Sequence, residues 1–328
     1  MNERYVVGID LGGTKIAAAL FDAQGVMVNR EQRETAGVRS AQDVVDRIIA
    51  LIRSVSGEKP IAGVGIASPG AVDTRKGIVL QGTNLPEWEN VPLKSWLEQD
   101  LDTEVQVVND ANAAAWGEYM RGAGRGSSSM IYITLSTGIG AGIVMDGKLM
   151  LGAHSFAGEL GHHIVDPSGP VCNCGGKGCW EVFASGTAIR NSAMLRIAER
   201  PSIIGLLAKH RGEEISARHV FEAYALGDDV AVEVIDRSIH YMALGLANVV
   251  HTFDPDRIVI GGGVSRAGDL LFPALIAKTE QLVMKAYRDS FSIVPAGLHD
   301  DVGLIGAAAL CGHLETGMPA KTCTTVER

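Results

Sequence analysis

Three of the five cysteines, Cys172, Cys174 and Cys179, lie within eight residues of one another and are separated by glycines. Glycines let the backbone turn tightly enough for the three sulfurs to converge. A histidine stands about ten residues upstream, as His162 or His163. Three thiolates and one imidazole form the closed, tetrahedral ligand set of a structural zinc site. The spacing therefore predicts a zinc site in this segment.

Clustered cysteines can instead form disulfides or pack as small apolar residues in a core. A disulfide would leave one of the three thiols unpaired, and nothing in the sequence indicates an oxidising compartment. Zinc is favoured for these reasons. Neighbouring side chains in an extended segment point to opposite sides, so only one of His162 and His163 should reach the metal. Two acids, Glu159 and Glu181, frame the segment, which we expect to hold polar side chains rigid so that they grip a small polyol.

A glycine bend lies between two apolar runs near the N-terminus. Residues 5–10 and 16–21 predict strands, with Leu-Gly-Gly-Thr-Lys between them and a third strand over 26–30. Backbone N–H groups at such a bend attract anions. Lys15 adds positive charge, and Asp10 could hold a hydrated magnesium ion. The alternative is a plain hairpin whose glycines only supply a positive φ.

The same pattern recurs over residues 130–145, as a strand, a bend containing Thr137 and Gly138, and a second strand. Two such hairpins at a long interval predict two lobes of similar topology. The phosphates of a nucleotide could be held between the two bends.

Asp110 follows a predicted strand over 105–108 and opens a predicted helix, within the run Asn109-Asp-Ala-Asn112. In open α/β sheets, ligands bind where a strand ends and a helix begins. An ionised carboxylate there can accept a proton from an attacking hydroxyl. The alternative is that Asp110 only caps the helix.

Further turns could line the same site. A strand over 61–67 ends at Ser68-Pro-Gly70, and Asn84 lies in the following loop, where an asparagine commonly serves only as a turn former. A strand over 257–260 leads into Gly261-Gly-Gly263, which opens a helix and would let a base or ribose approach the backbone. Close helix–strand packing would explain these glycines equally well.

The remaining periodicity predicts helices and one strand that connect these motifs. The helices cover 40–55, 92–98, 229–253, 270–287 and 301–310, with a strand near residue 292 and a frayed tail beyond 317. Asp254-Pro255 should end the long helix, because proline disfavours helical backbone in the residue before it.

Composition excludes several classes of protein. The chain has 328 residues, 46% of them hydrophobic, and a net charge of −9, so it carries no basic surface for nucleic acid. It has no signal peptide and no apolar run long enough to span a membrane. We expect a cytoplasmic protein.

Together the motifs resemble the ROK family of sugar kinases, repressors and open reading frames, and most closely its bacterial glucokinases. The resemblance covers nearly the whole chain and is most specific in the segment with Glu159, His162, the three cysteines and Glu181. It implies an α/β, two-lobed, actin-like ATPase (ribonuclease H-like) fold with a central cleft. The implied lobes are residues 1–109 with 302–328, and 110–301.

The resemblance also implies a role for each motif. Asp110 would be the catalytic base. The residues binding the sugar would be Gly70, Asn84, Asn109, Asp110, Glu159, His162 and Glu181. Those holding ATP would be Asp10, Gly12, Gly13, Thr14, Lys15, Thr137, Gly138, Gly262 and Gly263. Zinc would be held by His162, Cys172, Cys174 and Cys179, which leaves out His163.

The activity implied is ATP-dependent phosphorylation of glucose at the 6-hydroxyl, with Mg²⁺ and structural Zn²⁺ as cofactors, by a homodimer or homotetramer. Another hexose, such as N-acetylmannosamine, mannose or fructose, is the alternative substrate. A sugar-responsive repressor of the same family is a different alternative. Only nine residues precede Asp10, too few for a DNA-binding helix-turn-helix, which argues against it.

Overall fold

The computed structural model describes residues 4–35, 40–82, 88–312 and 314. The chain divides into two compact units, which we describe separately. Unit 1 comprises residues 1–126, 142–158 and 297–328, and unit 2 comprises residues 127–141 and 159–296. The lobes implied by the resemblance begin the second body at residue 110, whereas here helix α3 (Asp110–Arg121) belongs to unit 1.

Unit 1 is built on a five-stranded sheet of order β3-β2-β1-β4-β8. Its strands are β1 (Tyr5–Leu11), β2 (Lys15–Phe21), β3 (Met27–Glu34), β4 (Ile61–Ser68) and β8 (Val105–Asn109). The first three form an antiparallel meander, while β4 and β8 run parallel to β1. Strand β3 extends four residues beyond its predicted end at residue 30, because its polar, exposed residues continue to pair with β2 up to Glu34.

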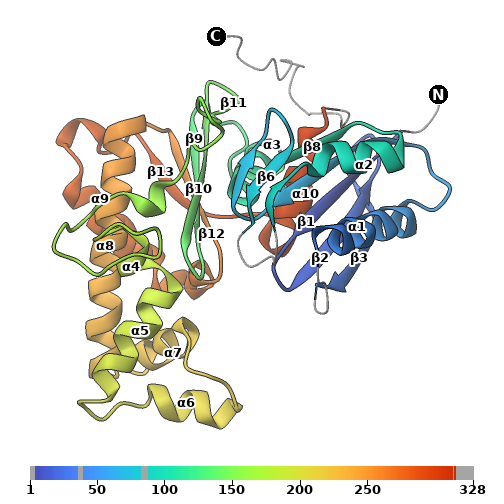
Figure 1. Cartoon of the computed structure of the whole chain (residues 1–328). Helices are drawn as coiled ribbons and strands as arrows, with labels where there is room; N and C mark the ends of the chain where they lie inside the picture. The colour runs from blue at the N-terminus through green and yellow to red at the C-terminus, as the bar shows by residue number, and fades with distance from the viewer. Residues whose placement is uncertain (1–3, 36–39, 83–87, 313, 315–328) are drawn as a thin grey trace. The chain divides into compact units, whose positions relative to one another are not determined.

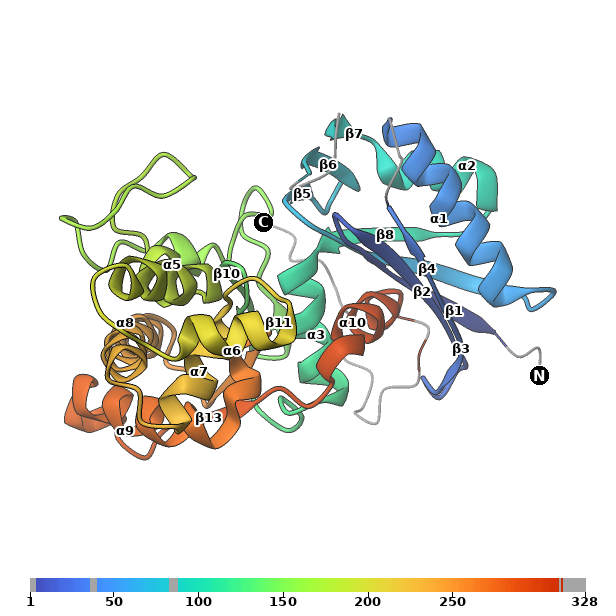
Figure 2. The same cartoon turned by 90° about the horizontal axis from the view of Figure 1, so that it is seen from below.

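Helices cover both faces of this sheet (Figure 2). Helices α1 (Ala41–Ser56) and α2 (Leu93–Leu101) bury their apolar residues against one face, in a core that includes Val7, Ile9 and Leu20. Helix α10 (Val302–Leu310) packs on the other face, where a Cβ on Gly8 or Gly65 would lie 2.2 or 1.8 Å from an α10 carbonyl oxygen. Glycine at these two strand positions therefore allows the close approach of α10.

A small antiparallel sheet, which the sequence did not predict, adds β5 (Ala71–Asp73), β6 (Ile78–Gln81) and β7 (Glu89–Val91). These strands have only three or four residues, too few to show alternation. Asn84 lies between β6 and β7, outside the described residues, as does the tail beyond 317.

The second five-stranded sheet, whose strands are labelled in Figure 1, has the order β11-β10-β9-β12-β13. Its strands are β9 (Met130–Leu135), β10 (Ile139–Met145), β11 (Lys148–Leu149), β12 (Arg257–Gly261) and β13 (Ser292–Pro295). Strand β12 runs parallel to β9 and β13, and β10 carries the chain from unit 2 into unit 1.

Unit 2 is otherwise mainly helical. Its α-helices are α4 (Glu181–Ala184), α5 (Gly186–Ile197), α6 (Ile204–Arg211), α7 (Ala217–Ala225), α8 (Asp229–Phe253) and α9 (Phe272–Leu282). Helix α8 packs against α5, α7 and α9 and has the predicted bounds. Within the described residues, no helix combines the length and apolar character needed to cross a bilayer.

The glycine run after β12 opens a helix, as expected, and this is a 3₁₀ helix (Val264–Leu270). The α-helix expected over 270–287 was wrong in its bounds, because it begins only at Phe272. That helix ends at Leu282 rather than Tyr287, because Val283 adopts an extended backbone with ψ 153°. A separate 3₁₀ turn follows at Lys285–Tyr287. The short 3₁₀ helices at Leu160–His162 and His299–Asp301 were not predicted.

Candidate active site

The segment between Ile164 and Glu181 folds back on itself as an irregular hairpin. Antiparallel bridges join Ile164 to Cys179 and Val171 to Lys177. The Trp180 N–H donates to the His163 carbonyl at 2.8 Å. Gly178 has a φ of 72°, and a Cβ there would lie 1.7 Å from the Asp166 carbonyl oxygen, so only glycine fits. These backbone contacts, rather than the cysteines alone, set the shape of the segment.

The hairpin brings together one ligand atom from each of His162, Cys172, Cys174 and Cys179, all within 4.8 Å of one another. The Cys174 and Cys179 sulfurs are 3.6 Å apart, and the Cys172 sulfur is 3.8 Å from His162 Nδ1. Two sulfurs bound tetrahedrally to zinc at about 2.3 Å would be separated by about 3.8 Å. The four residues therefore fit a zinc ion.

His162 rather than His163 enters this cluster, as the resemblance implied. His162 ends the 3₁₀ helix Leu160–His162, and its Nδ1 lies 3.8 Å from the Cys172 sulfur. The backbone of His163 instead closes the hairpin, since its N–H donates to Leu160 and its carbonyl accepts from Trp180.

The thiols differ in acidity. Burial raises the pKa of Cys172 to about 12 and also raises the pKa of Cys179. A hydrogen bond from the Gly176 backbone lowers the pKa of the exposed Cys174. A divalent cation at this position would deprotonate all three, because coordination displaces the thiol proton.

The two acids that frame the segment in the sequence, Glu159 and Glu181, lie on either side of the His162 imidazole. Glu159 Oε2 lies 3.8 Å from Nε2, and Glu181 Oε1 lies 3.7 Å from Nδ1. The Glu159 side chain is 61% exposed and the Glu181 side chain 22% exposed, so both can reach a solute. If Nδ1 binds a metal, Nε2 carries the proton and can donate a hydrogen bond outward.

The second glycine bend lies against this cluster. A Cβ on Gly138 would stand 2.7 Å from Glu181 Oε2, and a Cβ on Gly161 would stand 2.2 Å from the Ile139 carbonyl oxygen. The bend is closed by a hydrogen bond from the Ser136 N–H to the Gly138 carbonyl. Unit 2 therefore places a predicted phosphate-binding residue beside a predicted sugar-binding acid.

In unit 1, the helix cap that the sequence left open for Asp110 is provided by its neighbour Asn109. Asn109 is the N-cap of α3, and its side-chain oxygen accepts hydrogen bonds from the Ala111 and Asn112 N–H groups. Its amide nitrogen donates to the Gly70 carbonyl at 3.1 Å, which ties β8 to the turn after β4. Asp110 is the first helical residue and is exposed. Its carboxylate accepts a hydrogen bond from the Ala111 N–H at 2.8 Å.

The first glycine bend is held mainly by its own backbone. The Gly12 N–H donates to the Lys15 carbonyl at 2.9 Å, and the Thr35 hydroxyl donates to the Gly13 carbonyl at 2.7 Å. Thr14 and Lys15 are exposed. The Gly12 N–H is thus engaged within the turn, and cationic Lys15 is the group that the bend presents to an anion.

Asp10 lies at the end of β1, close to the start of α10. A Cβ on Gly303 would approach the Asp10 carboxylate within 2.8 Å. Burial raises the pKa of Asp10, and the nearby positive charges of Lys15 and Arg30 partly oppose this effect. Burial makes ionisation of this carboxylate unfavourable, and a bound cation would favour the ionised form. Asp10 could therefore hold magnesium.

Gly262 and Gly263, which follow β12, differ in whether local packing requires a glycine. Gly262 has a φ of 85°, and its Cβ would lie 2.4 Å from the Leu135 carbonyl oxygen. Gly263 has no atom within 4 Å of such a Cβ, so packing does not require it to be glycine. Close packing explains Gly262, whereas Gly263 leaves open backbone beside the turn.

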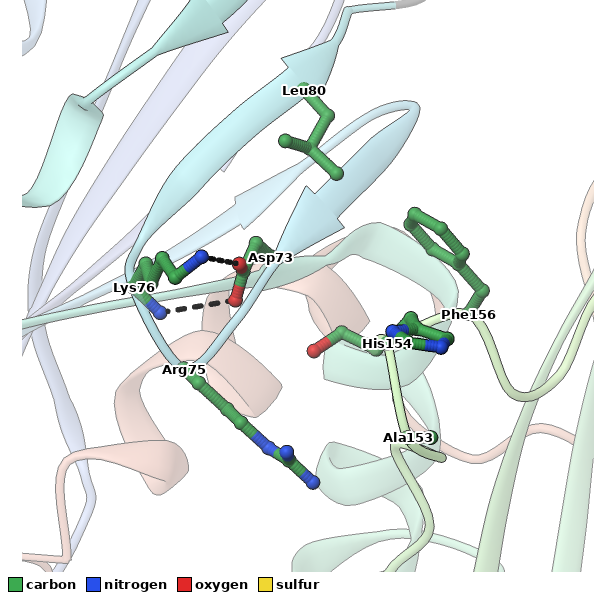
Figure 3. A pocket seen from close by; sticks show the side chains of 8 residues that line it. Asp73, Arg75, Lys76, Leu80, Ala153, His154 and Phe156 are labelled. Carbon is green, nitrogen blue, oxygen red and sulfur yellow. Dashed lines mark hydrogen bonds and ion pairs between the residues drawn. The ribbon is translucent and has the colours of Figure 1, made fainter.

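A separate cavity of about 350 Å³ lies in unit 1, between the β5–β6 turn and residues 153–156 (Figure 3). Its lining includes Leu80, His154 and Phe156, and an ion pair of 3.4 Å joins Lys76 to Asp73 at its edge. Among the residues that the structure describes, none of the predicted site residues lines this cavity. Sequence reasoning did not find it because the two short strands that shape it were missed.

Sequence reasoning also overlooked the packing behind the cysteine segment. Trp180 is buried, and its ring lies over Gly245 in the middle of α8. A glycine inside a strongly apolar helical pattern was the available signal, because such a residue usually has a packing reason.

Comparison with known proteins agrees with the motifs. The family model described as "ROK family" matches residues 6–313. A glucokinase of Thermotoga maritima is 39% identical over 94% of this chain and 98% of its own length. An N-acetylmannosamine kinase of Shigella boydii is 35% identical over 93% of this chain and 97% of its own length.

A solved structure extends the agreement to the fold. The ROK family glucokinase of Streptomyces griseus, in complex with glucose and AMPPNP, is 37% identical with a TM-score of 0.80. The match covers 93% of this chain and 98% of that one. The predicted α/β, actin-like kinase fold is confirmed by this likeness. Over nearly its whole length, the chain belongs to the ROK family.

Proposed function

We propose that the protein transfers the terminal phosphoryl group of ATP to the 6-hydroxyl of glucose. The observation that carries this proposal is the imidazole of His162, fixed beside three cysteines and flanked by two carboxylates within 4 Å. Such a set offers one donor and several acceptors to neighbouring hydroxyls, and a site built this way discriminates against sugars that lack them. The likeness to proteins named glucokinase supports glucose as the sugar.

In this mechanism Asp110 accepts the proton of the attacking hydroxyl. It is exposed at the first position of α3, while Asn109 caps the helix in its place. Asn109 also binds the Gly70 carbonyl, which holds the strand end that presents Asp110. Glu159, His162, Glu181, Asn109, Gly70 and Asn84 would bind the remaining hydroxyls.

The residues that would hold the phosphates of ATP are Asp10, Gly12, Gly13, Thr14, Lys15, Thr137 and Gly138. Gly262 and Gly263 would lie near the adenosine. Magnesium, held through Asp10, would neutralise phosphate charge, which is most of what phosphoryl transfer requires of its site. Zinc, held by His162 and the three cysteines, would fix the imidazole and its protonation.

Replacing Asp110 tests the proposal. Asp110→Asn keeps the shape of the side chain but cannot accept the proton, so kcat should fall by about 10²–10⁴-fold. The dissociation constant for glucose should change far less, because the carboxylate is one contact of several. A coupled assay of glucose 6-phosphate and calorimetric titration with glucose would measure the two quantities.

Asp100→Asn, an exposed acid on α2, is the matched control and should keep full activity. Retained turnover in Asp110→Asn would refute the assignment of the base.

N-acetylmannosamine is a second candidate substrate, since a kinase named for that sugar is 35% identical to this chain. A panel of glucose, mannose, fructose and N-acetylmannosamine at equal concentrations, with ATP as donor, decides between them. A higher kcat/KM for N-acetylmannosamine than for glucose would replace glucose in the proposal.

A further inference from the structure

The residue between a metal ligand and a sugar-binding acid is anchored deep in unit 2. Trp180 follows Cys179 and precedes Glu181, and its side chain is 1% exposed. Its indole N–H donates to the Tyr241 carbonyl oxygen in the middle of α8, at 2.8 Å. In an α-helix that carbonyl also accepts the N–H of the residue four positions on, which is Gly245. The indole therefore occupies the second acceptor position of a helical carbonyl.

Gly245 provides the space for this ring. A Cβ on Gly245 would lie 2.0 Å from one carbon of the Trp180 indole and 2.4 Å from its nitrogen. The indole is rigid and its nitrogen is tied to Tyr241, so it cannot turn aside as a flexible chain could. Glycine costs stability inside a helix, and this contact explains why one is present at position 245.

The same turn of α8 holds both sides of the hairpin. The Phe183 ring stacks on Tyr241, with centroids 4.1 Å apart and an interplanar angle of 15°. The Tyr241 hydroxyl donates to the Asp166 carboxylate at 3.3 Å. The segment before the cysteines and the segment after them thus share one support.

We propose that Trp180 is a positioning residue and that Gly245 provides the space in which its indole ring lies. Because its indole is anchored on α8, Trp180 fixes the backbone position of its neighbours Cys179 and Glu181. Through the zinc that Cys179 would bind, it also fixes the orientation of the His162 ring. This inference rests on the proposed function for the sugar and for the roles of Cys179, Glu181 and His162 as zinc and sugar ligands. It adds that α8, which carries none of the proposed ligands, determines how tightly the sugar is held.

Gly245→Ala is the direct test. At an open helical position alanine stabilises relative to glycine, but here the new methyl group displaces the indole, so Tm should fall. A displacement of about 1 Å can cost about 10²-fold in kcat/KM, and we expect a loss of about 10- to 100-fold for glucose, expressed mainly as a higher KM. The KM for ATP should change less than the KM for glucose, because the displaced residues are proposed sugar contacts, while the nucleotide loop is affected indirectly, where Gly138 lies beside Glu181.

Gly205→Ala is the matched control, since Gly205 lies in helix α6 with no atom within 4 Å of its added Cβ. It should keep both KM values and should not lower Tm. Equal losses in the two variants would mean that any helical glycine matters and would overturn the proposal.

A double variant separates positioning from general loss of stability. Trp180→Leu removes the ring and leaves space that the methyl group of Gly245→Ala can enter. The double variant Trp180→Leu/Gly245→Ala should therefore bind glucose more tightly than Gly245→Ala alone. The proposal would be refuted if the losses of glucose affinity in the two single variants simply added in the double variant. It would also be refuted if the KM for glucose of Gly245→Ala equalled that of the unaltered protein.

The rate at which a chromophoric chelator extracts zinc is a readout that needs no activity. It should rise in Gly245→Ala and return toward the rate of the unaltered protein in the double variant. If the unaltered protein does not phosphorylate glucose, the proposed function fails. Faster extraction of zinc from Gly245→Ala alone would still support the positioning of Trp180 by Gly245. An unchanged extraction rate would count against it.

Discussion

His162 shows how one side chain can serve two partners. Its Nδ1 lies 3.8 Å from the Cys172 sulfur, while its Nε2 faces Glu159 at 3.8 Å. The two ring nitrogens are chemically distinct, and the bond made by one determines the proton on the other. The ligand types could be predicted from spacing alone. The choice between the two histidines could not be made from the residues, because it depends on a 3₁₀ turn and on the bridge between Ile164 and Cys179.

Asp10 should reveal a conflict between stability and function. Its folded-state pKa is raised above 3.8, chiefly by burial. The contribution of this group to folding is therefore complete below that value and is lost as the pH rises through the raised pKa. Asp10→Asn removes the cost of a buried charge, so it should raise Tm at pH 7, with the difference shrinking as the pH approaches 3.

The same variant should lose phosphorylation if Asp10 holds magnesium. Thermal unfolding at several pH values, together with the rate at varied magnesium, measures both effects. Asp46→Asn, on the exposed side of α1, serves as control and should change neither. A lower Tm for Asp10→Asn at pH 7 would show that the carboxylate stabilises the fold instead.

At the scale of elements, the predictions succeeded where hydrophobic periodicity was long. The strands of the first sheet and the helix over 229–253 lie within a few residues of their expected positions. Strands β5, β6 and β7 were missed because three or four residues give no periodicity. The 3₁₀ helix after β12 could not be foreseen, since glycine permits both turn types and the contact of Gly262 with the Leu135 carbonyl is tertiary.

Helix α8 begins at a cap that also fastens the preceding loop. The Asp228 carboxylate accepts hydrogen bonds from the Ala231 and Ile203 N–H groups at 2.9 Å and from the Ser202 hydroxyl at 3.0 Å. Burial opposes ionisation of Asp228, but these donors outweigh it and lower its pKa. The stabilisation is therefore present above the ordinary pKa of 3.8 and is lost as the pH falls through the lowered value.

Asp228→Ala should reduce the free energy of unfolding by about 1–2 kcal/mol at pH 7, as loss of a helix cap does. The deficit should narrow as the pH falls through the lowered pKa of Asp228, because the carboxylate of the unaltered protein is then protonated as well. Urea unfolding over a series of pH values measures it. Asp229→Ala, at the exposed first position of the same helix, should cost less. Equal costs for the two variants would argue against the cap.

If the cluster of His162, Cys172, Cys174 and Cys179 holds zinc, as we propose, the whole molecule should depend on that metal in two ways at once. Structural zinc is worth on the order of 10 kcal/mol of folding free energy, and the cluster also orients His162 between the two acids. Chelation should therefore lower Tm and also abolish the further rise that glucose produces. That rise corresponds to about 2.7 kcal/mol when glucose is present at 100 times its dissociation constant.

Differential scanning calorimetry with and without chelator and glucose tests this expectation. Cys174→Ser should reproduce the effect of the chelator, whereas Cys311→Ser, on a thiol outside the cluster, should retain zinc and respond to glucose. A metal-stripped protein that binds glucose with undiminished affinity would show that the metal does not orient the sugar contacts.

The contact between Gly138 and Glu181 has a consequence for engineering this protein. A side chain at position 138 would displace the flexible Glu181 carboxylate, since its first carbon would stand 2.7 Å from Oε2. A substitution in the loop that we assign to the nucleotide would therefore also move an acid that we assign to the sugar. A combinatorial library should randomise both codons together, so that the residue at position 181 can adapt to the side chain introduced at position 138.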